Sequence, residues 1–497
     1  MKIVFATSHY GFLRNFEAGL RALGARGHEV TLLADRRENM GGTKTVEILT
    51  SAHPGITTQP GPARKDWPWQ TLAVNLRLCL DYWRYLHPCY AAAPALRARA
   101  ATQVPAVAVR MGDMPIVGSR PVIGLLSSLF KRLERAMPVP PSVIAFLERE
   151  RPDILVVTPL LYFGSQQVDY VRAARRLGIP TLLCVGSWDH LTTKGLIHEV
   201  PDRLTVWNEA QRTEAAEIHG IDPGRVLVTG STAYDHWFTA RPSRDRETFC
   251  AEVGLPSDRP IVLYLCSSPF ITPHEVPHVR RWLTALRSSA DPVLRGASVL
   301  VRPHPQNADQ WRDVSLDDLG PAGIWPAAGA NPVDVESRAT YFDSMFHSAA
   351  VVGVNTSALI ESGIVGRPVF TMHVEEFSGT QEGTLHFQHL KKINGGLLTH
   401  AATLDEHTRQ LAASLAGPPP AEPPGRKFIE SFIRPHGLSE PAGPRLADVI
   451  EATARDVKPT PVPPRRADAL IARLLQPVAL AAYAAARQRK LARKQAD

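Results

Sequence analysis

The residues best placed to do chemistry lie in the second half of the chain, after the apolar run in ASVLVRPHP. This run predicts a buried strand, and Arg302 and His304 follow its end. Pro303 and Pro305 restrict the backbone of the loop that carries them. A guanidinium and an imidazole at a strand end could contact the base, ribose or phosphate of a nucleotide. A solvent-exposed strand exit is the alternative interpretation.

A second candidate site lies about fifty residues further on, in VVGVNTSALIESGIVGRP. The pattern predicts a strand, then a turn that holds Asn355, Thr356 and Ser357, then a helix. Hydroxyls and backbone N–H groups at a helix N-terminus suit an anion, because the first amides lack helical partners and the helix dipole is positive there. The same residues would also form an ordinary helix cap. Glu361, one turn further, could accept hydrogen bonds from ribose hydroxyls or lie on a solvated face.

The first half of the chain offers two candidates for a general base. His9 follows the opening apolar run KIVFAT, and its imidazole would titrate near neutral pH. Asp189 follows another predicted strand, in TLLCVGSWDHLTTKG. Arg14, close to His9, could bind an anionic acceptor, and Lys194, close to Asp189, could contact a phosphate. Helix capping and turn formation are the structural alternatives for these loops.

Apolar strands that alternate with helices surround all of these candidates. The first half contains KIVFAT, HEVTLLAD, PDILVVTP and IPTLLCVGS, and a second series begins near Arg259 with RPIVLYLCSS. Continuous apolar strands between helices predict parallel sheets covered on both faces. A chain of 497 residues is long enough for two such domains and appendages. Ligands bind such sheets at the carboxyl ends of the strands, so the expected site is a cleft between the two domains.

The RPHP segment followed by NTSALIESGIVGRPVFT resembles the donor half of bacterial GT-B glycosyltransferases. The likeness is greatest to capsule and lipopolysaccharide enzymes and to polyglycerophosphate-type transferases. It implies that His304, Thr356 and Ser357 bind the donor and that Glu361 contacts its ribose. It also implies that His9 takes the place of the catalytic histidine that several GT-B families have after their first strand. Asp189 remains a rival base, as carboxylates serve in sialyltransferase-like enzymes.

The resemblance implies an α/β fold of two doubly wound Rossmann-like domains that face each other across a cleft. It implies a nucleotide-activated sugar as donor, a glycan or lipid-linked acceptor, and a role in bacterial surface polysaccharide synthesis. The expected parts are an acceptor domain (residues 1–240) with a helical insertion (about 60–141), a nucleotide-donor domain (241–457), a Pro-rich linker (458–464) and a basic helical tail (465–497).

We expect an inverting reaction that needs neither a metal ion nor a cofactor. Glu375 and Glu382 are one residue short of the Glu-x7-Glu spacing of many retaining GT-B enzymes, and no Asp-x-Asp pair lies in a convincing loop. Helix ends and cations would stabilise the departing phosphate instead. A nucleotide-sugar 2-epimerase and a glycerophosphotransferase with a CDP-activated donor are alternatives. A non-enzymatic assembly factor is the third.

The helical insertion contains several tryptophans and arginines: Trp67, Trp69, Trp83, Arg77 and Arg84. Tryptophan beside cations suits lipid headgroups, so one interpretation is an acceptor-binding or membrane-facing flap. The other interpretation is a set of helices that packs on the first domain.

The formal net charge of +8 comes mostly from the C-terminal end of the chain. Residues 465–497 contain eight Lys and Arg against two Asp, a surplus of six, which leaves +2 for the rest. The tail has the pattern of an Ala- and Leu-rich helix with basic ends, interrupted by Pro477. This pattern suits an anionic membrane surface, and a solvated or partner-packed helix is the alternative. Nucleic acid is not expected as a partner, because Tyr483 is the sole aromatic residue of the tail.

We expect a cytoplasmic protein, peripheral on the inner face of the membrane. The five cysteines are scattered without a CxxC pair, which favours a reducing compartment. The N-terminal segment MKIVFATSHYGF lacks the basic region of a secretion signal, and no run is expected to supply the ~20 apolar residues of a membrane-spanning helix.

Overall fold

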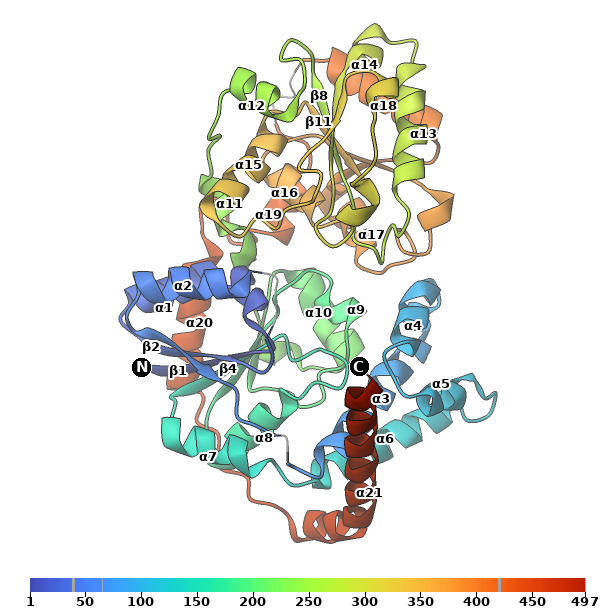
Figure 1. Cartoon of the computed structure of the whole chain (residues 1–497). Helices are drawn as coiled ribbons and strands as arrows, with labels where there is room; N and C mark the ends of the chain where they lie inside the picture. Colours follow the sequence, from blue (N-terminus) through green and yellow to red (C-terminus); the bar gives the residue numbers. More distant parts are fainter. Residues whose placement is uncertain (38–40, 65, 419–421, 497) are drawn as a thin grey trace. The chain divides into compact units, whose positions relative to one another are not determined.

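The computed structural model describes residues 1–37, 41–64, 66–418 and 422–496, and it divides into two compact units (Figure 1). Unit 1 comprises Met1–Ala233 and Pro441–Asp497, and unit 2 comprises Tyr234–Glu440. Each unit is built on one parallel sheet with helices around it. The predicted fold class, two doubly wound α/β domains, is therefore confirmed.

The sheet of unit 1 has seven parallel strands in the order β3-β2-β1-β4-β5-β6-β7. The strands are β1 (Lys2–Thr7), β2 (Glu29–Ala34), β3 (Ile56–Pro60), β4 (Ile154–Thr158), β5 (Thr181–Cys184), β6 (Arg203–Val206) and β7 (Val226–Val228). The order reverses direction between β1 and β4, which is where ligands bind in sheets of this kind.

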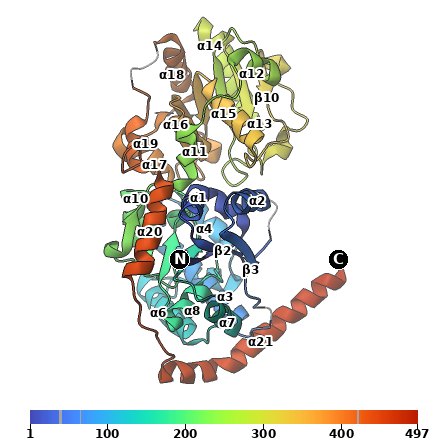
Figure 2. The ribbon, with the colours of Figure 1, turned by 90° about the vertical axis from the view of Figure 1, so that its left-hand side faces the viewer.

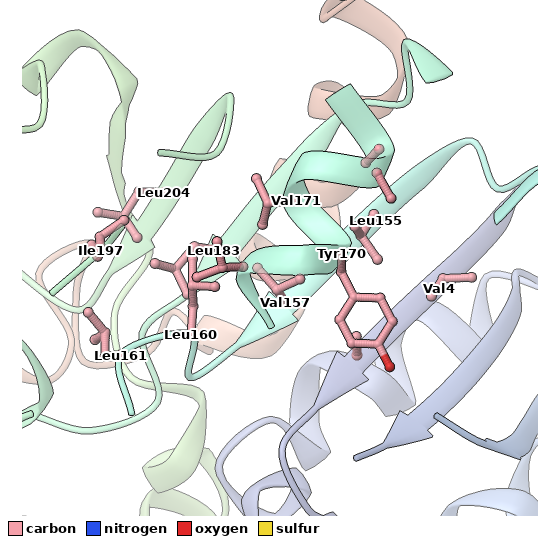
Figure 3. Packing of buried hydrophobic residues seen from close by; sticks show 14 of the residues in the cluster. Val4, Leu155, Val157, Leu160, Leu161, Tyr170, Val171, Leu183, Ile197 and Leu204 are labelled. Carbon is pink, nitrogen blue, oxygen red and sulfur yellow. The ribbon is translucent and has the colours of Figure 1, made fainter. Parts of the chain in front are cut away.

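Alternate residues of these strands supply two separate cores, because successive side chains point to opposite faces of a sheet. Val4 and Leu155 pack with Val171 on one face (Figure 3), whereas Ile3 and Phe5 belong to the core on the other face. The helices of the Rossmann-like part are α1 (Glu17–Ala25), α2 (Gly42–Ala52), α7 (Pro141–Glu150), α8 (Val168–Leu177), α9 (His190–Thr193) and α10 (Glu209–His219). Both faces are therefore covered, as a continuous apolar strand requires.

The chain returns to unit 1 after unit 2, through helix α20 (Ala442–Asp456), which lies against α1 (Figure 2). Close approach depends on glycine: a Cβ atom on Gly19 would lie 2.8 Å from Leu446, and one on Gly443 would lie 2.7 Å from the Ala18 backbone. We expected one boundary near residue 240 and assigned 441–457 to the second domain. The structure places the boundary at 233 and gives α20 to unit 1, because its apolar face completes the core beneath α1.

The insertion is helical, as predicted, and packs on unit 1. Its elements are α3 (Gln70–Trp83), η2 (Arg84–Leu86), η3 (Pro88–Tyr90), α4 (Pro94–Ala101), α5 (Ala106–Asp113) and α6 (Arg120–Ala136). Buried ion pairs join α3 to its neighbours: Arg77 contacts Glu134 at 2.7 Å and Asp169 at 2.9 Å. Trp67, Trp83, Arg77 and Arg84 are all buried. These four side chains therefore do not lie on an exposed membrane-facing surface, and the packing interpretation holds for them.

The Pro-rich segment 458–464 lies along the end of α8, where the Val462 amide donates to the carbonyl of Arg175 (3.1 Å). It leads to one long helix, α21 (Arg466–Ala496), which contacts α3 and α6. Pro477 lies inside this helix and does not interrupt it, contrary to our prediction. Its part Arg466–Ala492 is long and apolar enough to cross a membrane by length and composition, and this differs from our expectation of no such run.

The sheet of unit 2 has six parallel strands in the order β10-β9-β8-β11-β12-β13. The strands are β8 (Ile261–Leu265), β9 (Ser298–Arg302), β10 (Ala322–Ile324), β11 (Ala350–Gly353), β12 (Val369–Met372) and β13 (Leu398–Ala401). The helices are α11 (Asp235–Thr239), α12 (Arg246–Val253), α13 (Val276–Arg287), α14 (Pro292–Gly296), α15 (Val335–Phe346), α16 (Ala358–Ile364), α17 (Phe387–Lys392), α18 (Leu404–Ala416) and α19 (Arg426–Phe432). Trp282 and Trp311 are fully buried in its core.

Candidate functional site

Three loops at the carboxyl edge of the unit 2 sheet are joined by Ser267, which follows β8. Its carbonyl oxygen accepts a hydrogen bond from Asn307 Nδ2 (3.2 Å), in the loop after β9. Its hydroxyl oxygen accepts one from the backbone N–H of Asn355 (3.3 Å), after β11. Because β9, β8 and β11 are neighbours, the RPHP and NTSAL loops lie on either side of the β8 loop and are fixed to it.

The buried residue Glu275 holds the loop after β8 in place by hydrogen bonds. Its carboxyl group is fully buried and accepts hydrogen bonds from the Ser267 backbone N–H (3.0 Å) and the Tyr264 hydroxyl (3.2 Å). Burial raises the pKa of Glu275 to about 8. The carboxyl group of Glu275 is therefore largely protonated at neutral pH. It stabilises the loop after β8 without adding a full negative charge to the carboxyl edge of the sheet.

Arg302 is a buried cation at the end of β9. Its guanidinium donates to the hydroxyl of Ser344 (2.9 Å) and lies over the rings of Tyr341 and Trp325, at 4.8 and 5.3 Å from their centroids. Burial lowers the pKa of Arg302 to about 10, so the side chain stays charged at neutral pH. Within the described residues Arg302 forms no ion pair at contact distance, and Glu361 is the carboxylate that acts on its charge from nearby.

Glu361 is connected to Arg302 through Tyr341, whose hydroxyl donates to Glu361 Oε2 (2.5 Å). Burial raises the pKa of Tyr341 well above its usual value, which keeps this hydroxyl protonated as a donor. Arg302, Tyr341 and Glu361 thus form one continuous group across β9, α15 and α16. The sequence supplied no signal for Tyr341, because it lies within a helix between the two motifs.

His304 is half-buried in the RPHP loop, and its ring orientation is fixed by a local hydrogen bond. Its Nδ1 accepts from the backbone N–H of Gln306 (3.1 Å). The neutral imidazole then carries its proton on Nε2, which makes Nε2 a hydrogen-bond donor. A donor at this position suits a phosphate or hydroxyl oxygen of a ligand.

In the NTSAL turn, Asn355 holds the loop in place, whereas Thr356 and Ser357 lie at the start of α16. Asn355 is buried, and its Nδ2 donates to the Thr380 carbonyl (3.2 Å) and the Thr384 hydroxyl (3.4 Å). Thr356 Oγ1 accepts from the Ala358 amide (3.4 Å), as in a local turn. Ser357 is exposed, and its side chain makes no capping hydrogen bond. Ser357 is therefore the more exposed hydroxyl of this turn, while Asn355 positions the loop.

The carboxyl edge of the unit 1 sheet is organised around the ring of Phe12, in the 3-10 helix η1 (Tyr10–Asn15). This ring lies 4.7 Å from His9, 5.6 Å from Tyr162 and 5.8 Å from His190, measured between ring centroids. These residues follow β1, β4 and β5, which are neighbours in the sheet. The structure therefore brings together His9 and the loop of Asp189, the two candidate bases.

Asp189 and His9 differ in what surrounds them. The two carboxylate oxygens of Asp189 accept hydrogen bonds from the hydroxyls of Ser187 (2.5 Å) and Thr193 (2.9 Å). Hydrogen bonds to the charged form reduce the basicity of a carboxylate. His9 is buried beside an aromatic ring in an extended backbone position before η1. Of the two candidates, Asp189 is therefore the one whose oxygens already accept hydrogen bonds from neighbouring hydroxyls.

The other predicted residues of unit 1 lie near the two candidate bases or at the surface. Burial lowers the pKa of His190 to about 4, so this imidazole is neutral. Burial also lowers the pKa of Lys194, and the nearby Asp189 opposes that effect. Arg14 is exposed near the end of η1. Lys194 therefore belongs to the Asp189 loop, whereas Arg14 lies at the surface.

The glutamates of the segment 375–382 are held in ion pairs. Glu376 contacts Arg281 (2.7 Å), and Glu382 contacts Lys391 (2.8 Å) and His400 (2.7 Å). These contacts give the glutamates a structural role. In the part of the chain that the structure describes, no three His, Cys, Asp or Glu residues gather as a metal site.

No protein-family model matches the chain, and no curated protein is similar to it in sequence. Solved structures do resemble it. A putative UDP-N-acetylglucosamine 2-epimerase from Listeria monocytogenes is 12% identical with a TM-score of 0.51, over 92% of this chain and 98% of that one. The fold is of the GT-B type.

Two further structures are similar over most of their length. The UDP-GlcNAc 2-epimerase of Methanocaldococcus jannaschii is 11% identical with a TM-score of 0.48, over 91% of this chain and 99% of that one. WaaG, a glycosyltransferase involved in lipopolysaccharide biosynthesis, is 12% identical with a TM-score of 0.45, over 90% and 99%. At such low identities, structural similarity identifies a fold and leaves the reaction open.

Proposed function

We propose that the protein is a glycosyltransferase that moves a sugar from a nucleotide-activated donor to a glycan or lipid-linked acceptor in surface polysaccharide synthesis. The observation that carries this proposal is the carboxyl edge of unit 2. There Ser267 fixes the loops of His304 and Asn355 on either side of itself, beside the buried charge of Arg302. This edge offers a cation, a hydrogen-bond donor and an exposed hydroxyl to one anionic ligand.

Each donor-binding residue has a defined role in the proposal. His304 Nε2 donates to a phosphate or ribose oxygen, and the Ser357 hydroxyl donates to a phosphate. The Glu361 carboxylate, whose Oε2 accepts from Tyr341, also accepts from a ribose hydroxyl, since a carboxylate oxygen accepts more than one hydrogen bond. Arg302 contributes its positive field from within the protein. Together they bind a nucleotide without requiring a metal ion.

The proposed reaction is an inverting displacement with His9 as the general base. The acceptor hydroxyl gives its proton to His9 as its oxygen attacks the anomeric carbon of the donor sugar. The bond between that carbon and the phosphate oxygen breaks, and the electron pair leaves with the nucleotide. Cationic and N–H groups of unit 2 stabilise the negative charge that develops on the leaving phosphate.

The acceptor chemistry and the tail point to the inner face of a membrane. Helix α21 exposes Leu470, Leu474 and Val478, whose side chains are 61%, 72% and 52% accessible, among the cations of the basic tail. Apolar side chains beside cations bind anionic lipid surfaces. We therefore propose a peripheral protein that reaches a lipid-linked acceptor at the membrane.

Calorimetric titration with UDP, CDP, CMP and GDP tests the donor site. The wild-type protein should bind one nucleotide best, and His304→Ala and Ser357→Ala should each weaken that binding about tenfold, equivalent to about 1.4 kcal/mol. His436→Ala, an exposed histidine of unit 2 after α19, is the matched control. Equal affinity of all four proteins for every nucleotide would remove the donor-site assignment. A preference for CDP would favour the glycerophosphotransferase alternative.

A nucleotide-sugar 2-epimerase is the second candidate, favoured by the 0.51 TM-score with a putative enzyme of that kind. An epimerase converts its nucleotide sugar without any acceptor. Incubation of the preferred nucleotide sugar alone, followed by NMR of the sugar C2 position, separates the two reactions. Inversion at C2 without an acceptor establishes the epimerase, and an unchanged sugar leaves the transferase.

A further inference from the structure

A cavity of about 390 Å³ lies in unit 1 among the helical insertion and α10, and none of the residues that we assign to the base or the donor lines it. Helices α3 and α6 form two of its walls, and Figure 1 shows them beside each other. Its apolar lining is contributed by Leu80, Trp83, Leu86, Ile123, Leu196 and Ile218. Its volume lies within the range of about 300–1,000 Å³ that is usual for small-molecule sites.

A buried arginine lines the same cavity. Arg84 is 8% exposed, and its guanidinium donates to the carbonyls of Gly195 (2.5 Å) and Leu191 (2.8 Å) and contacts the Tyr90 hydroxyl. Within the described residues Arg84 forms no ion pair at contact distance, its Nε has no hydrogen-bond partner, and the buried carboxylate of Asp81 acts on its charge from nearby. A buried cation without an ion pair creates a positive potential that favours an anion nearby.

The side of the cavity that α6 forms carries two further cations. Arg120 and Lys131 line it together with Gly124 and Ser127, at spacings that place all four on one face of the helix. Burial and the neighbouring Arg135 lower the pKa of Lys131. Glu217 of α10 is the opposing carboxylate, so the lining holds three cations against one acid, besides His87.

We propose that this cavity binds an amphiphile with a phosphate head group, its hydrocarbon chain against the apolar wall and its phosphate at Arg120 and Lys131. The inference rests on the proposed function, because a lipid-linked acceptor has this chemistry. Two exposed apolar side chains are close in sequence to lining residues: Ile116, two residues before Gly118, is 79% exposed, and Leu125, next to Gly124, is 72% exposed. They add apolar surface to the part of the insertion that carries the cavity.

Calorimetry with farnesyl phosphate, below its critical micelle concentration, tests the proposal on the full-length protein. Farnesol, which has the hydrocarbon chain alone, and inorganic phosphate, which has the head group alone, are titrated for comparison. Because the cavity combines an apolar wall with cations, farnesyl phosphate should bind at least about tenfold more tightly than either half. Equal affinity for farnesol and farnesyl phosphate would overturn the phosphate assignment. Absence of farnesyl phosphate binding would overturn the whole inference.

Gly124 offers a variant that fills the cavity without disturbing the fold. A Cβ atom built on Gly124 meets nothing within 4 Å, and the residue lines the cavity from within α6. Gly124→Phe should therefore fold normally and lose farnesyl phosphate affinity by at least about tenfold, while Gly124→Ala should bind like the wild type. Unchanged binding by Gly124→Phe, with an unchanged thermal transition, would place the ligand elsewhere.

The charged side of the cavity is tested by a double variant, Arg120→Gln with Lys131→Gln. Removal of two cations from the phosphate position should weaken farnesyl phosphate about tenfold and leave farnesol unaffected. Arg110→Gln, an exposed arginine on α5 outside the lining, is the control. Equal binding by the double variant and the control would overturn the head-group assignment.

A second arm of the test identifies the source of the lipid. If the occupant is a lipid of the bilayer, vesicles that contain phosphatidic acid should bind Gly124→Phe more weakly than the wild type. If the occupant is an amphiphile that has left the bilayer, the vesicles should bind both proteins equally. UDP titration of the same samples keeps this inference separate from the proposed function. Nucleotide binding without farnesyl phosphate binding removes the cavity assignment alone, and the reverse result removes the donor-site proposal alone.

Discussion

The carboxyl edges of the two sheets hold their loops together by different means. In unit 1, the apolar ring of Phe12 contacts His9, Tyr162 and His190, from the loops after three neighbouring strands. In unit 2, Ser267 joins three loops by hydrogen bonds. The edge of unit 1 thus places a histidine among aromatic rings, and the edge of unit 2 places polar groups beside a buried cation.

Under the proposed function, this difference suits the two edges to different parts of the reaction. Hydrogen-bond donors with a positive field stabilise phosphate oxygens, so the unit 2 edge suits a nucleotide. An imidazole at the end of a strand can accept the proton of a hydroxyl group, so the unit 1 edge suits general-base catalysis.

The largest effect that tests this comparison is expected at His9. His9→Ala should lower kcat by about 10² to 10⁴, because one general base typically contributes that factor. Asp189→Asn should lower kcat less than about tenfold, since the Asp189 carboxylate already accepts two hydroxyl hydrogen bonds. Product formation at saturating donor measures both. A larger loss in Asp189→Asn than in His9→Ala would assign the base to Asp189.

Glu275 provides a pH test of the polar edge. The pKa of Glu275 in the folded protein is raised to about 8, above its unfolded value, so the folded state binds the proton more tightly. Its contribution to stability is complete below the unfolded pKa of about 4.5 and is lost as the pH rises through 8. Denaturant unfolding at pH 5 and pH 8 should show unit 2 less stable at pH 8, by up to about 4 kcal/mol.

Glu275→Gln should remove most of that pH dependence, because an amide does not titrate in this range. Glu376→Gln is the matched control, since Glu376 is exposed and pairs with Arg281 at the surface. An identical pH dependence in the wild type and in Glu275→Gln would show that another group causes it.

The basic tail gives a test of intermediate size on the unit 1 side. A chain truncated at Lys458 should bind anionic vesicles at least about tenfold more weakly at low salt, because the tail cations contribute about 1 kcal/mol each at best. High salt should release the full-length protein, since it screens those charges. Vesicle flotation measures both. Equal flotation of the two proteins at low salt would contradict membrane binding through α21.

The smallest effect is expected at Ser267. Ser267→Ala removes the hydroxyl that accepts from the Asn355 amide but keeps the carbonyl contact to Asn307, so nucleotide affinity should fall by about 1 kcal/mol, about fivefold. Ser298→Ala is the control: Ser298 is equally buried at the start of β9, and its hydroxyl has no hydrogen-bond partner among the described residues. Equal affinity of both variants would show that the loops keep their positions without this contact.

The sequence by itself determined the strands and the order of the motifs. Runs such as IVFA and ILVV are apolar at every position, which is typical of strands buried on both faces. The positions of Arg302 and Ser357 at strand ends followed from the same local pattern. These features depend on residues that are neighbours in the chain, so a periodic pattern identifies them.

The tertiary structure alone decided which of those side chains are exposed and which are buried and hold a loop in place. Asn355 and Arg77 are buried by contacts with residues 25 to 92 positions away, and α20 packs on a helix from the opposite end of the chain. Ser267 and Tyr341 belong to the candidate site through contacts with Asn355 and Glu361, which lie 88 and 20 positions away, and Glu275 belongs to it through Ser267. A local pattern cannot identify a distant partner. The apolar face of α20 could pack on many surfaces, and it packs on α1 because Gly19 and Gly443 allow the two helices to approach closely.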